Sequence, residues 1–225
     1  MEDNPRVSII IPTLNEALII GSLLTELESL AQVEIIISDG GSTDDTLGIC
    51  SRYPVKVCTG CAGRGAQLNR GAQAAVADIL LFLHADCHIP AALIQQIINA
   101  VAEGAMWGCA QIAFDDWGCF FNWLAWVSNL RARWLSSCYG DQAIFCQREF
   151  FNNNGRFPEI IFLEDLAFSH LARRQQQALV VPVKVISSSR RFRAGGPWRT
   201  VVKMQIIKLL YFLGVSPERL YLMYR

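Results

Sequence analysis

Carboxylates stand at the ends of three apolar runs of the sequence. Glu16, Asp39 and Asp86 each follow such a run within a few residues. In a parallel sheet, ligands bind beyond the carboxyl ends of the strands, where the connecting loops gather. A single acidic loop residue is usually no more than a solvated charge. Three successive runs that each deliver an acid predict a shared ligand site.

The segments that must position these acids alternate between strand and helix. Short apolar, β-branched runs are typical of strands buried on both faces, as in a parallel sheet. The runs lie at 7–11, 34–38, 55–58 and 79–83. Helical spacing of apolar residues is found at 17–30, 43–53, 64–76 and 90–103. This alternation predicts an α/β fold built on βαβ units.

The pattern is looser beyond residue 104, although elements are still recognisable. We expect strands at 110–114, 143–146 and 179–186, and helices at 117–134, 166–176 and 198–213. No internal repeat or low-complexity linker interrupts the chain. A length of 225 residues with 52% hydrophobic composition therefore suits one domain.

Charge is balanced overall but unevenly placed. The 20 Lys and Arg residues equal the 20 Asp and Glu residues, so no global field favours nucleic acid. From residue 186 to the end there are eight basic residues and one acidic residue. The remaining 12 basic and 19 acidic residues precede this segment. We expect this basic tail to meet an anionic partner, either a phosphate group or a membrane surface.

Several features favour a cytoplasmic location. The N-terminal residues are acidic and lead straight into the first apolar run, unlike a signal peptide. No apolar run reaches the roughly 20 residues of a membrane-spanning helix. The eight cysteines are scattered, and the lone C-x-x-C pair, Cys58 and Cys61, has no second pair to complete a zinc site. We expect reduced cysteines.

Three motifs resemble those of family 2 glycosyltransferases, which have the GT-A fold. They are SIIIPTLNE at 8–16, SDGGSTDDT at 38–46 and LFLHAD at 81–86. The resemblance implies one domain over 1–225, with a mostly parallel twisted sheet and helices on both faces. Residues 1–104 would form the nucleotide-sugar-binding half, and 105–225 the acceptor-side half with a basic amphipathic tail. The His-Ala-Asp variant, YGDQ at 139–142 and LGVSPER at 213–219 resemble a small bacterial subfamily.

The resemblance implies donor-binding roles for residues of the first two motifs. Asp39 matches the acid that takes the uracil or ribose, and a carboxylate can accept from an imide N–H or from sugar hydroxyls. Pro12, Asn15 and Glu16 match the first nucleotide-contact loop, with Glu16 toward the ribose. Gly41 lets the backbone come close to the ligand.

Further positions match the family's donor site less closely. Asp44 either frames the nucleotide pocket or caps the helix that follows. Arg64 would pair with a phosphate and Asn69 would contact the base or ribose, although a surface helix start also explains this segment. Arg190 and Arg191 would close over the diphosphate and stabilise it as it leaves. A basic stretch beside a membrane-like tail is the alternative for these arginines.

The third motif implies a divalent metal, Mg²⁺ or Mn²⁺. Asp86 matches the metal-binding acid of the family's D-x-D motif, and Ala85 beside it would lie at the donor. The first acid of that motif is replaced by His84. Mg²⁺ is often held by one or two carboxylates plus the substrate phosphates, so Asp86 can still serve. His84 would bind Mn²⁺ through nitrogen or hydrogen-bond to the donor, while His88 is either a further ligand or an exposed loop residue.

Transfer needs a base, and the family places an acid near a helix start for this purpose. Asp165 and Glu164 match it. A general base must lie within about 3 Å of the proton that it takes. We expect Asp165 to be the base and hold Glu164 as the second choice. Adjacent residues at a helix start point in different directions, so only one of them is expected to face the substrate. The alternative is that these two acids only stabilise the N-terminus of the helix through its macrodipole. Asp141 and Gln142 are expected on the acceptor or donor-sugar side.

The resemblance implies an inverting, metal-assisted transfer of a sugar from a UDP- or GDP-linked donor to an acceptor hydroxyl. A catalytically inactive nucleotide-sugar or membrane-surface binding protein is the alternative, because the first D-x-D acid is lost. A dinucleotide-binding oxidoreductase lacks support, because no G-x-G-x-x-G follows the first strand. Aromatic residues gather in 117–134. They favour either contact with the inner face of the plasma membrane, with a lipid-linked acceptor, or a core helix with a homodimer contact.

Overall fold

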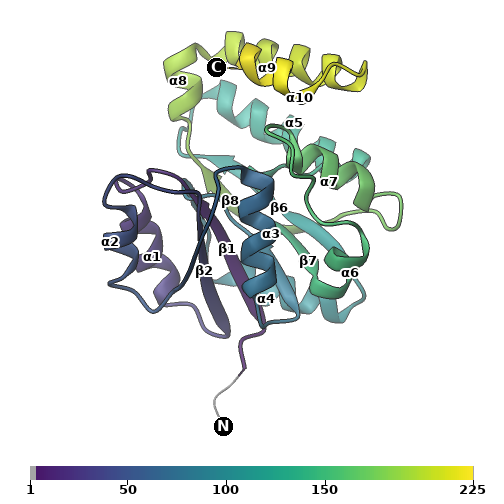
Figure 1. The fold of residues 1–225 in the computed structure, drawn as a ribbon. Helices are drawn as coiled ribbons and strands as arrows, with labels where there is room; N and C mark the ends of the chain where they lie inside the picture. Colours follow the sequence, from purple (N-terminus) through teal and green to yellow (C-terminus); the bar gives the residue numbers. More distant parts are fainter. Residues whose placement is uncertain (1–3, 225) are drawn as a thin grey trace.

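One sheet forms the centre of the computed structural model, which describes residues 4–224 (Figure 1). Within those residues the sheet has eight strands in the order β3-β2-β1-β4-β7-β6-β8-β5. Their bounds are β1 Val7–Thr13, β2 Val33–Asp39, β3 Lys56–Thr59, β4 Ile79–Phe82, β5 Cys87–His88, β6 Trp107–Phe114, β7 Ile144–Gln147 and β8 Leu179–Ser187.

The sheet is parallel in its first half and mixed in its second. Strand β1 pairs in parallel with β2 and β4, β2 with β3, and β6 with β8. Strand β7 is antiparallel to both β4 and β6, and β5 is antiparallel to β8. Because β7 runs against its neighbours, the uninterrupted parallel pairing of the first half ends at β4.

Helices cover both faces of the sheet because the central strands are apolar on both faces. In β1, Val7, Ile9 and Ile11 pack into one buried cluster, whereas Ile10 packs into another. The first cluster also contains side chains of α1 Ile20–Glu28 and α4 Ala92–Ala102. The second contains side chains of α3 Arg64–Ala74, α5 Cys119–Leu135, α6 Arg148–Asn153 and α7 Glu164–Ala172.

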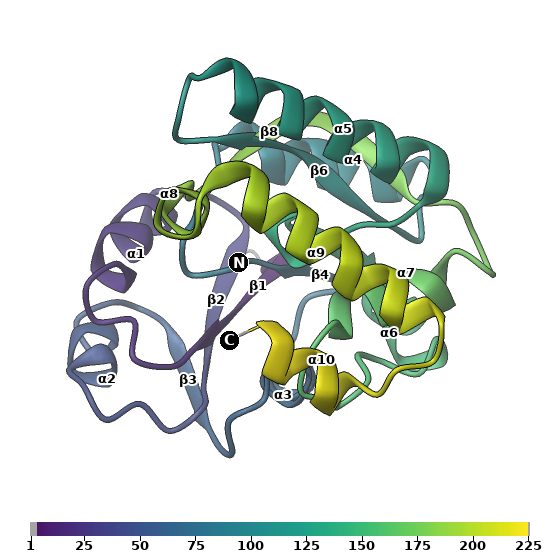
Figure 2. The same cartoon turned by 90° about the horizontal axis from the view of Figure 1, so that it is seen from above.

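Three helices near the end of the chain lie over the carboxyl edge of the parallel strands. They are α8 Arg190–Gly195, α9 Pro197–Phe212 and α10 Pro217–Tyr224. Figures 1 and 2 show them as a layer across the top of the molecule, at the end opposite the N-terminus. A separate apolar cluster fixes this layer, because Ile207 and Leu220 pack against Phe162, Leu163 and Leu166. The layer therefore roofs the edge where the predicted site residues gather.

Most predicted elements are present, with displaced ends. The helix expected at 43–53 is shortened to α2 Thr46–Cys50, because the preceding residues form a hydrogen-bonded turn in which Asp44 accepts from the Thr46 N–H. The helix expected at 166–176 instead spans Glu164–Ala172. Sequence analysis missed β5, α6, α8 and α10, which are all short. No helix within residues 4–224 has the length and apolar character needed to cross a bilayer.

Candidate functional site

A cavity of about 260 Å³ lies at the carboxyl edge of the sheet, beneath α8–α10. Eleven residues predicted from the sequence line it: Pro12, Glu16, Arg64, His84, Ala85, Asp86, Asp141, Glu164, Asp165, Arg190 and Arg191. Six others, Asn15, Asp39, Gly41, Asp44, Asn69 and Gln142, are not among its lining residues. The fold thus brings together residues from distant parts of the sequence, and the six others belong to the turns and supports around the cavity.

Asp39 organises the turn that follows β2. Its Oδ2 accepts hydrogen bonds from the N–H groups of Gly41 and Ser42, both at 2.8 Å. Its Oδ1 accepts from the hydroxyls of Thr13 and Ser42. Burial works against the charged form, but these hydrogen bonds outweigh it and lower the pKa of Asp39. The carboxylate is therefore ionised and holds the 40–42 turn, including Gly41 with its positive φ of 93°.

Asn15 and Asp44 join the loops after β1 and β2. Asn15 Oδ1 accepts from the Thr43 N–H at 2.8 Å, and its own N–H donates to Ser42 Oγ at 2.9 Å. Asp44 accepts from the N–H groups of Thr46 and Ala17 at 3.0 and 3.1 Å. Asp44 thus binds the first N–H of α2 from the position before the N-cap residue Asp45, and its role in the nucleotide pocket stays a prediction.

Asn69 and Gln142 support other walls of the cavity. Asn69 exchanges two hydrogen bonds with the backbone of Phe157, at 2.9 and 3.1 Å, and so ties α3 to the loop before α7. Gln142 is fully buried, and its Oε1 accepts from the guanidinium of Arg131 on α5. Both side chains position the loops that carry lining residues.

His84 is a neutral side chain packed against the backbone. Burial, followed by the nearby positive charge of Arg64, lowers its pKa to about 3. The ring lies so close to Gly140 that a Cβ at that position would come within 2.2 Å of Nε2. His84 therefore stands in the cavity wall as an uncharged imidazole, which retains a nitrogen lone pair. His88, in contrast, pairs with Glu26 on α1 through a contact of 2.6 Å and is not a lining residue.

Asp86 and Asp141 are the candidate metal-binding carboxylates. Asp141 Oδ1 is buried and, within the described residues, has no hydrogen-bond partner. Burial raises the pKa of Asp141 to about 6; Arg131 opposes this rise, while Asp165 and Asp86 add to it. An unpartnered carboxylate oxygen beside a second acid fits a divalent cation. The described residues do not form a cluster of three protein ligands, so such a cation would need the donor phosphates as further ligands.

Glu164 and Asp165, at the start of α7, both line the cavity. Both side chains line the same cavity, so the choice of Asp165 over Glu164 as the base stays a prediction. Glu164 is 2% exposed and lies 3.6 Å from Arg64 Nη1. Burial, and then the charge of Asp165, raise its pKa to about 7 against the opposing effect of Arg64. Asp165 accepts from the N–H groups of Gly140 and Leu166 at 2.9 and 2.6 Å.

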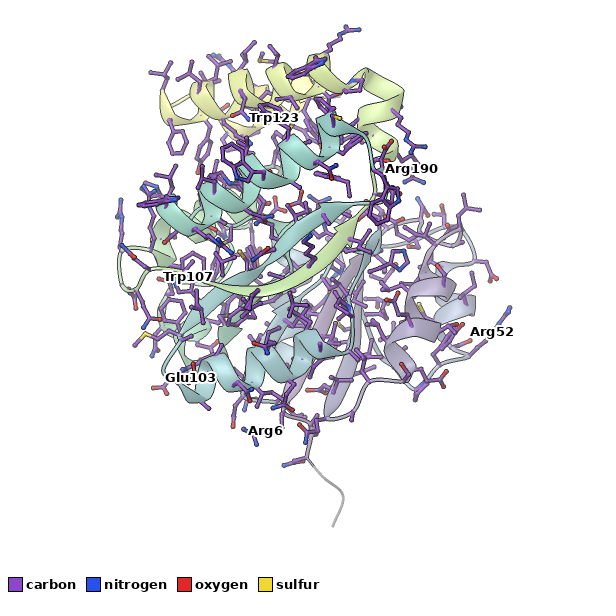
Figure 3. All side chains as sticks on the ribbon, turned by 180° about the vertical axis from the view of Figure 1, so that it is seen from behind. Arg6, Arg52, Glu103, Trp107, Trp123 and Arg190 are labelled. Carbon is purple, nitrogen blue, oxygen red and sulfur yellow. The ribbon has the colours of Figure 1, made fainter. Side chains whose placement is uncertain are left out.

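Basic residues face these acids from α3 and α8. Arg64, Arg190 and Arg191 line the cavity, and Figure 3 shows Arg190 where the chain enters the roof. The guanidinium carbon of Arg191 lies 4.0 Å from the ring centroid of Tyr224 on α10. Arg193, on the same helix, instead pairs with Asp116 at 2.7 Å. The cavity therefore combines carboxylates with positive charge, as a ligand with phosphates and a metal requires.

Sequence reasoning missed the lining residues of the roof. Thr200, Met204 and Lys208 line the cavity from one side of α9, and Tyr139 lies below them. The Tyr139 ring lies between Arg131 and Lys208, with centroid distances of 3.4 and 4.4 Å. The i, i+4, i+8 spacing of the three α9 residues was an available signal, because such residues share one helix face.

The family model described as Glycosyl transferase family 2 matches residues 8–157, which is more than half of the chain. The chain belongs to glycosyl transferase family 2. The matched span includes the three motifs that suggested this family, so the family prediction is confirmed. The more specific resemblance to a His-Ala-Asp subfamily stays a prediction.

Curated relatives match only part of their own length. The chain is 32% identical over 109 residues to a dolichol-phosphate mannosyltransferase of Pyrococcus furiosus, covering 44% of this chain and 31% of the relative. It is 35% identical over 91 residues to a PGL/p-HBAD biosynthesis glycosyltransferase of Mycobacterium bovis, covering 36% of each. The chain thus spans about a third of the length of these curated relatives.

Solved structures match the fold over almost the whole chain. S. aureus TarS 1-349 has a TM-score of 0.67 at 18% identity, covering 97% of this chain and 69% of TarS. The mannosyltransferase PcManGT from Pyrobaculum calidifontis, in complex with GDP-Man and Mn²⁺, has a TM-score of 0.66 at 19% identity, covering 96% and 66%. The predicted GT-A type α/β fold is confirmed for this family 2 chain.

Proposed function

We propose that this family 2 chain transfers a sugar from a UDP- or GDP-linked donor to an acceptor hydroxyl, with inversion at the anomeric carbon. The observation that carries the proposal is one cavity at the carboxyl edge of the sheet. It brings Asp86 and Asp141 together with Arg64, Arg190 and Arg191. A diphosphate and its cation need both kinds of charge in one place. Complexes of structural neighbours with UDP-GlcNAc and with GDP-Man support a donor of this class.

The nucleotide is proposed to lie over the loops after β1 and β2. Pro12 and Glu16 would contact it from the cavity wall. Asp39 is buried and already accepts four hydrogen bonds, which occupy the lone pairs of its carboxylate, so it would hold the 40–42 turn against the base or ribose instead of contacting it directly. The open space in front of Gly41, where a Cβ would meet nothing within 4 Å, supports a close approach there.

The donor diphosphate is proposed to bind between the acids and the arginines. Asp86 would hold Mg²⁺ or Mn²⁺ together with the free oxygen of Asp141, and His84 offers a neutral nitrogen beside them. When bound, the cation supplies positive charge that offsets the charge of the departing nucleoside diphosphate. Arg190 and Arg191 would neutralise the same oxygens from the opposite side.

Asp165 is proposed as the general base. It is less buried than Glu164, and its contact with the Gly140 N–H fixes its direction. It would take the proton of the acceptor hydroxyl as the oxygen attacks the anomeric carbon from the face opposite the leaving group. Glu164 is the second candidate, since a pKa of about 7 also suits a base at neutral pH. Asp165→Asn should therefore reduce kcat far more than Glu164→Gln, and the reverse order would exchange the two roles.

The acceptor is proposed to enter on the side of Tyr139, Asp141 and Lys208, with Gln142 as a buried support. A lipid-linked acceptor, a cytoplasmic location at the inner face of the plasma membrane and a homodimer all stay predictions. The prediction of a lipid-linked acceptor is supported by the similarity to a protein named dolichol-phosphate mannosyltransferase.

Hydrolysis of the donor tests this function without knowledge of the acceptor. UDP- and GDP-sugars are incubated with the chain and Mn²⁺, and the released nucleotide is measured for wild type and Asp86→Ala. Slow, metal-dependent release that the substitution abolishes supports a transferase. Tight donor binding with no release under any condition, and none when candidate acceptors are added, would favour the inactive binding protein instead.

A further inference from the structure

Two helices carry exposed apolar stripes that the cavity does not use. On α5, the large side chains of Trp123, Trp126, Leu130 and Trp134 are exposed. Their spacing of three and four residues places them on one face of the helix. The opposite face of α5 is buried through Phe121, Leu124 and Ala132. Helix α5 thus packs into the core through one face, and the stripe lies on its other face, outside the core.

Helix α9 carries the second stripe. Trp198, Val202, Ile206 and Leu209 are exposed and again follow helical spacing. The cavity-lining residues Thr200, Met204 and Lys208 occupy other positions of the same helix. Helix α9 thus separates the cavity from an outer apolar surface.

The two stripes meet to form one surface, which we call the α5/α9 face. The rings of Trp123 and Trp198 lie 5.3 Å apart. Figure 3 shows Trp123 between α5 and the helices above it, and Figure 2 shows α9 running over the molecule beside α5. The stripes thus join at Trp123 and Trp198, and large exposed apolar patches of this kind mark interaction sites.

The charge of the α5/α9 face identifies its partner. Neither α5 nor α9 contains an acid, and together they contain five basic residues. Arg131 and Lys208 lie against Tyr139, and Lys203 donates to the Tyr224 carbonyl. The exposed basic residues of the two helices are therefore Arg133 and Arg199. Exposed tryptophans beside basic residues match the interface of an anionic bilayer, where amphipathic rings and cations are both favoured.

A second copy of the chain fits this face less well. In a symmetric dimer the same surface meets itself, so two acid-free, basic faces would be brought together. Like charges opposed across an interface are unfavourable. Because no described helix can cross a bilayer, contact with the surface is the mode that remains for these helices.

We propose that the α5/α9 face docks on the surface of an anionic lipid bilayer, with α9 between the lipid and the cavity. This proposal goes beyond the transfer reaction and stands independently of it. Docking would bring the cavity to within one helix layer of the membrane, close to any acceptor hydroxyl carried on a lipid.

Vesicle co-sedimentation of the full chain tests the proposal. We compare vesicles of phosphatidylcholine alone with vesicles that also contain phosphatidylglycerol, at low and at high salt. We expect partition that requires phosphatidylglycerol and is weakened by salt. Trp126→Ser combined with Trp134→Ser should abolish it. Arg133→Ser should reduce it about fivefold, the effect of one basic residue near an anionic surface.

A matched control and a second measurement keep the outcomes distinct. Val76 is an exposed apolar residue between the end of α3 and the start of β4, at the opposite edge of the sheet from the roof. Val76→Ser should bind vesicles like wild type, and circular dichroism should show all variants folded. Absence of binding to phosphatidylglycerol vesicles, or equal binding by the double Trp variant, would overturn the proposal. A dimer in sedimentation equilibrium that the double Trp variant dissociates would assign the face to a second copy instead.

Discussion

Glu164→Gln should change the pH dependence of stability in a way that follows from the burial of this side chain. Burial, and then Asp165, raise the pKa of Glu164 from 4.5 to about 7, although Arg64 opposes the rise. The folded chain therefore binds this proton more tightly than the unfolded chain does. The associated stability is fully present below the unfolded pKa and is lost as the pH rises through about 7. The difference between the two pKa values corresponds to about 3 kcal/mol.

The assay is urea unfolding at about pH 3.5 and about pH 8, the first below the ordinary pKa of 4.5 and the second above the raised pKa of about 7. Glutamine cannot ionise. From the lower to the higher pH, the free energy of unfolding of Glu164→Gln should therefore fall by about 3 kcal/mol less than that of wild type. Glu103→Gln is the matched control, because Glu103 is an exposed residue at the far end of the molecule (Figure 3). An equal loss of stability in Glu164→Gln and wild type would refute the raised pKa and the burial on which it depends.

Three further predictions address the walls of the cavity and its cation. Gly140→Ala would place a Cβ 2.2 Å from His84 Nε2, so it should lower the free energy of unfolding by about 1–3 kcal/mol and weaken donor binding. Gly21→Ala is the control in α1: its Cβ would lie 3.4 Å from its nearest neighbour, Ile49 Cγ2 of α2, and the variant should be neutral or stabilising. Urea unfolding that gives both variants equal stability would contradict the close packing at Gly140. Asp39→Asn should lose stability at neutral pH and converge with wild type in acid, because the lowered pKa of Asp39 gives a stabilisation that disappears as the pH falls through it; thermal melts that differ equally at both pH values would argue against this. EDTA should abolish donor hydrolysis and Mn²⁺ should restore it, whereas full release of nucleotide in EDTA would exclude a metal.

The parallel half of the fold was predictable because the centres of β1, β2 and β4 are buried on both faces. Three consecutive isoleucines lie at 9–11 in β1 and at 35–37 in β2, and polar loops follow both strands, so the apolar runs and the loops together mark where each strand ends. The ends of elements were less predictable. Asn15 adopts a φ of 58° and exchanges hydrogen bonds with the 42–44 turn, which delays the start of α1 to Ile20. That delay depends on contacts between residues 27 to 29 positions apart.

The site was predictable where a residue follows a strand of the sheet and less so elsewhere. Asp86 and Glu16 lie in the cavity because their strands end at its edge. The motif around Asp39 predicted where this residue lies but not its hydrogen-bond partners, because its carboxylate accepts from the backbone of the turn that follows it. Lys208 and Tyr224 reach the cavity only because α9 and α10 fold back over the sheet. Their contribution depends on tertiary packing around Phe162, which no local pattern records.

Isothermal titration of UDP and GDP, each with and without Mn²⁺, tests the donor site most directly. It is carried out on wild type, on Asp86→Ala and on the control Asp78→Ala, which removes an exposed acid before β4. We predict that one nucleotide binds in a metal-dependent manner, that Asp86→Ala weakens binding by at least about tenfold, or ~1.4 kcal/mol, and that Asp78→Ala does not. Failure of both nucleotides to bind wild type with Mn²⁺ would contradict the proposed donor site.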